Sequence, residues 1–140
     1  MGQRMIVADT NLVLSCVVRG IASSKALAVR ARDNEWIAPR LLRSELLNAL
    51  GKYVVVAKTM DRDLAVKAFR RGLNMVTLVD QESDPVDVLN VSAKSGLTSY
   101  DAEFVVLASQ RNVRLVTLDK GILDAFPDLA VNISDFAAGE

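Results

Sequence analysis

Short apolar segments of strand length alternate along this chain with longer segments of helical periodicity, and this alternation restricts the fold more than any other feature. Strands are predicted at residues 5–8, 36–38, 75–79, 113–118 and 129–133. Alternating strands and helices are typical of a parallel sheet covered on both faces. We therefore predict the α/β class, as a parallel sheet flanked by helices.

The helical segments carry recognisable start and stop signals. A short helix is expected directly after Asp9, and further helices at residues 23–32, 39–58, 61–73, 84–96 and 99–111. Asp and Pro stand at several of the predicted starts and Gly at a predicted end, as helix termini favour. Because no Pro- or Gly-rich linker and no repeat interrupts the pattern, residues 1–140 are predicted to form a single domain.

No apolar run approaches the length of a membrane-spanning helix, and the N-terminus lacks the apolar core of a signal peptide. We therefore expect a soluble, cytoplasmic protein with no membrane partner.

The composition restricts the available chemistry. The chain contains no His, and Cys16 is its only cysteine, which excludes imidazole catalysis, an internal disulfide and cysteine-based zinc sites. Carboxylates remain, and their oxygen atoms suit hard cations such as Mg²⁺ or Mn²⁺. Basic and acidic residues number seventeen each, so net charge does not by itself indicate a nucleic-acid partner.

Two acids lie on apolar faces of predicted helices. Glu45 falls between Leu41 and Ala49 on the apolar arc of its helix, and Asp101 projects towards Phe104 and Ala108 on another. Neither has a basic residue three or four positions away, so neither can form a local ion pair. Alternatively, Glu45 lies at the edge of its stripe near the surface, and Asp101 belongs to a capping box that begins at Thr98. Glu103 is interpreted as a solvated charge.

Two further acids directly follow predicted strands. Asp9 ends the run Ile6-Val-Ala-Asp9, and Asp119 ends the run Leu115-Val-Thr-Leu-Asp119. Ligands of open parallel α/β sheets bind outside the carboxyl ends of the strands. The alternative is that each Asp caps the helix after it, as is common for Asp in such loops.

The four acids together favour a metal site. Two carboxylates about 4 Å apart repel each other by roughly 4 kcal/mol at an effective dielectric constant near 20. A divalent cation removes this repulsion, and carboxylate-bound Mg²⁺ most often serves phosphoryl chemistry, in which metal-bound water attacks. Asp9, Glu45, Asp101 and Asp119 are therefore the predicted metal-binding and catalytic residues, with Thr10, Asn11 and Thr117 as supporting polar groups or ordinary turn residues.

At these residues the sequence resembles a PIN domain, and within that family the VapC-type toxin ribonucleases of prokaryotic toxin–antitoxin systems. The matching segments are Ile6-Val-Ala-Asp9-Thr-Asn11, Arg43-Ser-Glu45-Leu-Leu-Asn-Ala49, Ser99-Tyr-Asp101-Ala and Leu115-Val-Thr-Leu-Asp119-Lys120. The resemblance implies a PIN-like α/β/α sandwich, Mg²⁺- or Mn²⁺-dependent endoribonuclease activity, a homodimer, and inhibition by a small VapB-like antitoxin. It assigns metal binding to the same four acids.

Contacts with RNA and with protein partners are less clearly encoded. The basic residues nearest the acids in sequence are Arg19, Lys25, Arg40, Arg43 and Lys120, and these are the predicted RNA-binding residues. For any one of them, ordinary surface charge is the alternative. The apolar run Val54-Val-Val-Ala57 suits either a dimer or antitoxin groove, or core packing.

Other functions predict different chemistry at Asp9. A phosphatase of the haloacid dehalogenase type would use Asp9 as a nucleophile but needs a second Asp two residues later, where this chain has Asn11. A phosphoacceptor domain would want an acidic pair near the first strand, and only one acid follows it. A non-catalytic protein-binding module with the same fold is the third alternative.

Overall fold

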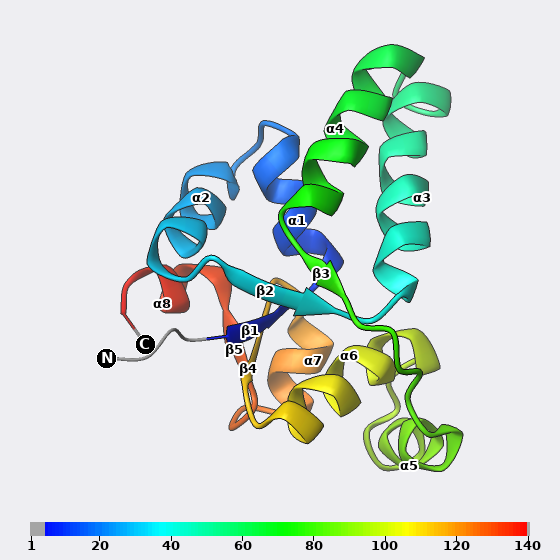
Figure 1. The fold of residues 1–140 in the computed structure, drawn as a ribbon, viewed down its shortest axis with the longest axis vertical. Helices are drawn as coiled ribbons and strands as arrows, with labels where there is room; N and C mark the ends of the chain where they lie inside the picture. Colours follow the sequence, from blue (N-terminus) through cyan, green and yellow to red (C-terminus); the bar gives the residue numbers. More distant parts are fainter. Residues whose placement is uncertain (1–4, 140) are drawn as a thin grey trace.

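Five parallel strands form the centre of the computed structural model, which describes residues 5–139 (Figure 1). They are β1 (Met5–Ala8), β2 (Glu35–Ala38), β3 (Thr77–Leu78), β4 (Arg114–Thr117) and β5 (Ala130–Asn132). Their order across the sheet is β3-β2-β1-β4-β5, and every neighbouring pair is parallel. The predicted α/β class and parallel sheet are confirmed, although β3 is much shorter than the apolar run at 75–79.

Eight helices connect the strands or follow them within the described part of the chain. They are α1 (Thr10–Val17), α2 (Ser23–Arg32), α3 (Leu41–Val55), α4 (Arg62–Asn74), α5 (Pro85–Ser95), α6 (Ser99–Arg111), α7 (Lys120–Ala125) and α8 (Ile133–Ala137). The short helices α7 and α8 are additional to the predicted elements. Within residues 5–139, no helix is long and apolar enough to cross a membrane.

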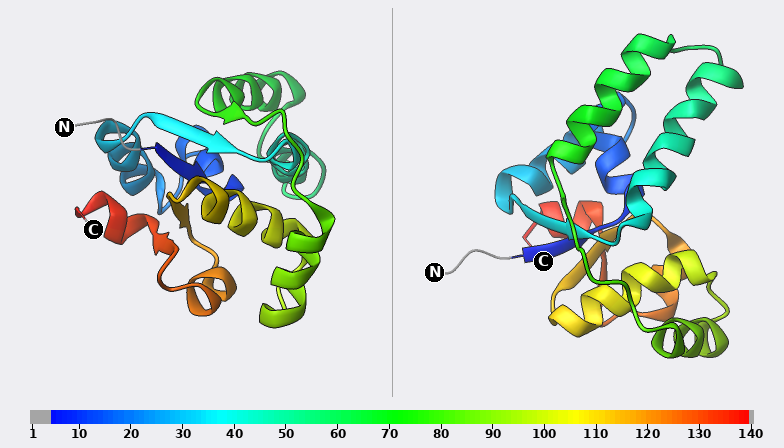
Figure 2. Two further views of the ribbon diagram at one scale, coloured as in Figure 1. Left: turned by 60° about the horizontal axis from the view of Figure 1, so that its bottom comes forward. Right: turned by 45° about the vertical axis from the view of Figure 1, so that its right-hand side comes forward.

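The helices cover both faces of the sheet. Helices α1 to α4 lie on one side, with α8 against α2, whereas α6 and α7 lie on the other side and α5 packs on α6 (Figure 2). The chain proceeds outward from β1 to β2 and β3, then returns to place β4 on the other side of β1. The strand order therefore reverses between β1 and β4, which is where α/β sheets of this kind bind ligands.

Helix α3 is positioned by an apolar stripe with a four-residue spacing. Leu42, Leu46 and Leu50 are fully buried against the core, as the periodicity predicts. The helix ends at Val55 rather than extending towards Lys58, whose φ of 54° is left-handed and cannot continue a helix. Beyond the stripe, Val55 and Val56 are 71% and 76% exposed, so the core-packing alternative for this run is wrong.

Capping side chains fix several helix ends where the sequence predicted them. Asp61 and Asp84 accept hydrogen bonds from the backbone N–H groups of Leu64 and Val86 at the starts of α4 and α5. At the end of α5, Gly96 has a φ of 77°, which a residue with a Cβ rarely adopts.

Candidate functional site

The four predicted acids meet at the carboxyl edge of the sheet, beside the point where the strand order reverses. Asp9 directly follows β1, and Asp119 follows β4 by two residues. Glu45 comes from the second turn of α3, and Asp101 from the first turn of α6. The negative charges of Glu45 and Asp101 both act on Asp9, and that of Asp119 acts on Asp101. Acids more than a hundred residues apart in the sequence, such as Asp9 and Asp119, thus belong to one cluster.

Asp9 is held by three hydrogen bonds at the start of α1. Its Oδ1 accepts from the backbone N–H of Thr10 at 2.7 Å, and its Oδ2 accepts from the Thr117 hydroxyl at 2.6 Å. The Asn11 side-chain amide lies 3.3 Å from the same Oδ2 and donates to it. With only 6% of Asp9 exposed, these bonds fix the carboxylate in one orientation.

Thr117 and Asn11 connect the loops after β1 and β4. The Thr117 hydroxyl oxygen accepts from the backbone N–H of Asp119 at 2.9 Å and from the Asn11 amide at 3.2 Å. Asn11 Oδ1 in turn accepts from the backbone N–H of Leu118 at 3.0 Å. The structure therefore places both supporting residues between Asp9 and Asp119, where they set the relative position of the two loops.

Thr10 positions the third acid. Its hydroxyl donates to Glu45 Oε1 at 2.7 Å and so links the start of α1 to α3. Glu45 is half-buried, between Leu41 and Ala49 on its helix, as the periodicity predicts. The bond aims the Glu45 carboxylate at the cluster rather than into solvent.

Three of the local capping interactions proposed as alternatives are also present. Asp9 caps α1, Asp119 Oδ1 accepts from the backbone N–H of Ile122 at 3.0 Å and caps α7, and Thr98 accepts from the backbone N–H of Asp101 at 3.2 Å. Capping uses one carboxylate oxygen of Asp119 and leaves the other for a ligand. Capping and a shared site are therefore compatible at these positions.

The cluster raises the pKa values of three of its carboxyl groups. Burial, reinforced by the charges of Glu45 and Asp101, raises the pKa of Asp9 to about 6, although the hydrogen bonds from Thr117 and Thr10 act in the opposite direction. Burial also raises the pKa of Glu45 and of Asp101, and neighbouring carboxylates add to both effects. Within residues 5–139, none of the four acids forms a salt bridge.

Glu103 belongs to this electrostatic environment, contrary to its interpretation as a solvated charge. It is half-buried on α6, its charge raises the pKa of Glu45, and its own pKa is raised by burial and by Glu82.

The predicted RNA-binding residues are spread over the molecule. Lys120 is exposed next to Asp119, and Arg40 is exposed at the start of α3. The Arg43 guanidinium stacks on the Phe69 ring, 5.4 Å from its centroid. Arg19 follows α1 (Thr10–Val17), which spans about 12 Å at the rise of an α-helix, and Lys25 lies in α2 (Ser23–Arg32). Lys120 directly follows one predicted acid, and Arg40 directly precedes the helix that carries another.

Comparison with known proteins agrees with this fold. The sequence model of the PIN domain family matches residues 6–128. The chain belongs to the PIN domain family. PIN domains are generally nucleases and usually use divalent metal ions, so the fold of this chain is of the nuclease type.

A solved structure with the same architecture is that of PAE2754 from Pyrobaculum aerophilum. It superposes with a TM-score of 0.76 over 96% of this chain and 93% of that protein, at 18% sequence identity. This likeness shows the fold. None of the curated proteins matches the sequence significantly.

The four acids of this PIN domain are of the ligand type that a hard divalent cation prefers. All four acids supply carboxylate oxygens, and Asp9 is buried among like charges that only protonation or a cation relieves. Among residues 5–139, however, no three acidic or cysteine side chains are arranged so that they could hold one ion as they stand. The chemistry of the donors therefore fits, while their present positions do not form a closed ligand set.

The site geometry disfavours a phosphatase that uses Asp9 as a nucleophile. Such an enzyme needs an acid where this chain has Asn11, and the Asn11 amide is occupied by hydrogen bonds to Asp9, Thr117 and Leu118. Asp9 itself is 6% exposed and has hydrogen bonds to both oxygens, which leaves little access for in-line attack on a phosphate.

Proposed function

We propose that this PIN domain is an endoribonuclease that depends on Mg²⁺ or Mn²⁺, with Asp9, Glu45, Asp101 and Asp119 as its metal-binding and catalytic acids. The observation that supports this most is the convergence of these carboxylates, from four separate elements, with raised pKa values at three of them and no basic partner among residues 5–139. Such an arrangement costs stability unless a cation compensates the charge.

The residues of the chain have distinct roles in this proposal. A divalent cation bound by the acids would supply activated water and stabilise the charge that develops on the phosphate. Thr117 and Asn11 orient Asp9, and Thr10 orients Glu45, so two of the ligands are positioned before any cation binds. Glu45, which is half-buried and is the longer side chain, is placed to accept a proton from the attacking water or to act as a further ligand.

In this proposal Lys120, which directly follows Asp119, contacts the RNA backbone, and Arg40, at the start of α3, contacts the bound RNA. Both are exposed, and neither stacks on an aromatic ring as Arg43 does. Arg19 and Lys25 contribute only if the RNA extends past the end of α1.

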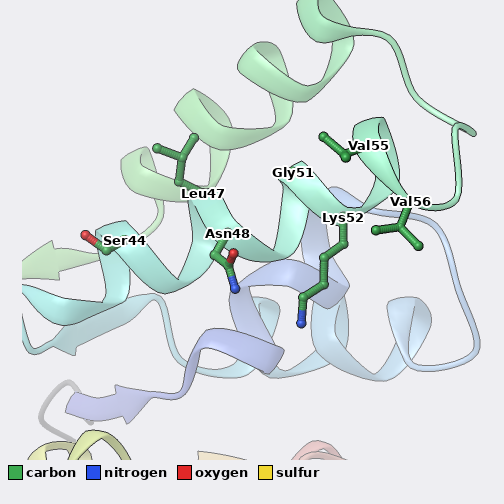
Figure 3. Close-up of a pocket in the computed structure, with 7 residues that line it drawn as sticks. All are labelled: Ser44, Leu47, Asn48, Gly51, Lys52, Val55 and Val56. Atoms are coloured by element: carbon green, nitrogen blue, oxygen red, sulfur yellow. The ribbon is translucent and has the colours of Figure 1, made fainter.

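We further propose that the chain is the toxin of a VapBC-type pair, that it forms a homodimer and that a small antitoxin binds it. The surface that suits a protein partner is the outer face of α3, where Leu47, Val55 and Val56 are exposed along a hollow of about 520 Å³ (Figure 3). Asn48 and Lys52 supply polar groups beside these apolar side chains, as in many protein interfaces (Figure 3).

The decisive experiment is cleavage of a mixed pool of structured RNAs by the purified, partner-free protein in Mn²⁺. Cleavage is expected to disappear in EDTA and in Asp101→Asn, and to persist in Asp84→Asn, which changes an exposed helix cap that is not one of the four acids. Cleavage that survives in Asp101→Asn would show that the site is assigned wrongly. A folded protein that binds Mn²⁺ and cuts no RNA would favour a non-catalytic protein-binding module.

A further inference from the structure

A second hollow lies next to the acidic cluster, beyond the carboxyl ends of β2 and β3. It encloses about 310 Å³ and is formed by the start of α3, the segment after β3 and one face of α6. Leu41 in its wall is one helical turn before Glu45, and the charge of Glu103, also in its wall, acts on Glu45. A molecule in this hollow would therefore touch the cluster without occupying it.

The lining of this hollow combines apolar walls with charged groups of both signs. Leu41 and Leu107 supply apolar surface, and Arg40, Gln81 and Glu103 supply polar groups. The volume is at the lower end of the range for ligand pockets, roughly 300–1,000 Å³, which suits a fragment as small as one nucleotide. Polar atoms form most of this lining, so a flat ring bound there would be held mainly by hydrogen bonds, with the leucine side chains against it.

The charged groups of the hollow are available to a ligand. Within residues 5–139, the Glu103 carboxylate makes no hydrogen bond and no salt bridge. Arg40 has one ion pair, to Glu82 at 3.9 Å, and both side chains are largely exposed, at 62% and 84%. Pairs of this kind contribute little, so the guanidinium can exchange Glu82 for another acceptor.

We propose that this hollow binds the base of a nucleotide next to the scissile phosphate, and that Glu103 and Arg40 together select guanine. The inference rests on the proposed ribonuclease function for its cleavage assay, while its binding assay is independent of that function.

Guanine is the base that matches both charged groups. Its adjacent N1–H and N2–H groups can donate to the two oxygens of one carboxylate, and its O6 and N7 atoms accept from an arginine in the commonest base-specific contact. Adenine and cytosine each offer a single amino group to a carboxylate, and uracil offers a single N–H between two carbonyl oxygens. The acidic side of the hollow also disfavours a phosphate group there, because Glu82 and Glu103 would repel it.

The first test maps the cleavage sites of the wild-type protein on the RNA pool by sequencing the new ends. Guanine is expected to be enriched at one position flanking the cut, by about tenfold over the other bases. In Glu103→Gln this enrichment should largely disappear. The matched control is Glu35→Gln, which makes the same change at the opposite edge of the sheet, at the start of β2, and should retain it.

The cleavage data also separate a base-reading role from a cation-binding role for Glu103. A base-reading Glu103 leaves the Mn²⁺ concentration at half-maximal cleavage unchanged in Glu103→Gln. If the variant instead needs more Mn²⁺ and loses cleavage equally at all sites, or if wild-type cuts show no guanine enrichment, the proposal is overturned.

A binding measurement tests the hollow without any catalysis. In NMR titrations of the ¹⁵N-labelled protein with the four nucleoside 5′-monophosphates, GMP should shift the amides of Leu41, Ser83 and Leu107 at lower concentration than AMP, CMP or UMP. The shift should be lost in Glu103→Gln and kept in Glu35→Gln. Selective GMP binding by a protein that cuts no RNA would support the hollow and refute the nuclease function, whereas four equal titrations would refute the hollow.

Discussion

Replacing Asp9 by Asn should stabilise the metal-free protein at alkaline pH, although it removes a buried group that makes three hydrogen bonds. The pKa of Asp9 is raised from 3.8 to about 6, mainly by burial. The folded state therefore holds a proton on Asp9 more tightly than the unfolded state does, and stability falls as pH rises from about 4 to above 6. Above that range, a shift of roughly two units costs about 3 kcal/mol.

The expected net gain is smaller than this cost, because Asn is an imperfect replacement. Oδ2 of Asp9 accepts from Thr117 and lies near the donating amide of Asn11, and an amide nitrogen at that place would oppose both donors. The loss of one such bond costs about 1 kcal/mol. We therefore expect Asp9→Asn to raise the free energy of unfolding by about 1–2 kcal/mol at pH 8, and to lose most of this gain at pH 5, where Asp9 is largely protonated in the folded wild type.

The assay is urea unfolding in EDTA at pH 8 and pH 5, for the wild type, Asp9→Asn and Asp84→Asn. Asp84 is an exposed cap of α5, and since Asn caps helices about as well as Asp, its variant should change stability little at either pH. The reasoning about charge in the cluster would be refuted if Asp9→Asn were no more stable than the wild type at pH 8, or if its effect were the same at both pH values.

Three further predictions follow from the same geometry. Saturating Mn²⁺ at about a hundred times its Kd should stabilise the wild type by about 2.7 kcal/mol in thermal unfolding, and Asp101→Asn should abolish most of this shift. Thr117→Val removes a hydrogen bond that lowers the pKa of Asp9, so the acidic limb of the pH–kcat/KM profile should move to higher pH; an unmoved limb would show that Asp9 does not control it. Val56→Asp, directly after α3, should convert a dimer into monomers in light-scattering chromatography, whereas Leu27→Asp, at another exposed apolar position on α2, should not.

The sheet was predictable from the sequence because parallel strands buried on both faces leave an unmistakable apolar pattern. Met5–Ala8 and Arg114–Thr117 are such segments, and they pair with each other in the structure. The prediction fails for β3, because the five-residue segment 75–79 yields only a two-residue strand at the sheet edge. It also misses α8, which is too short for helical periodicity to show. Edge and terminal elements depend on tertiary contacts that local sequence does not encode.

That the four acids lie near one another could be predicted from the sequence, whereas their hydrogen-bond partners could not. A carboxylate on an apolar helix stripe or directly after a buried strand can be recognised in the sequence as unusual, and Glu45 and Asp9 are examples. The bond from Thr10 to Glu45 spans 35 residues, and the bond from Thr117 to Asp9 spans 108. Such partners become visible only when the strand order is known, and Glu103 was missed for the same reason, since its charged neighbours Glu45 and Glu82 belong to other segments.

For Asp9 and Asp119, helix capping and membership of the acidic cluster occur in the same arrangement. Each carboxylate caps a helix with one oxygen, because the strand-to-helix turns at this edge of the sheet expose backbone N–H groups that need an acceptor. The same turns carry the carboxylates to the point where the strand order reverses and where α3 and α6 contribute Glu45 and Asp101. The capping hydrogen bonds hold the acids in place against their mutual repulsion. The same local bonds that fold these loops therefore keep together the charges that destabilise the metal-free site. In the proposed nuclease, a cation bound there would relieve this repulsion, and the free energy that it costs the metal-free fold would be recovered on binding.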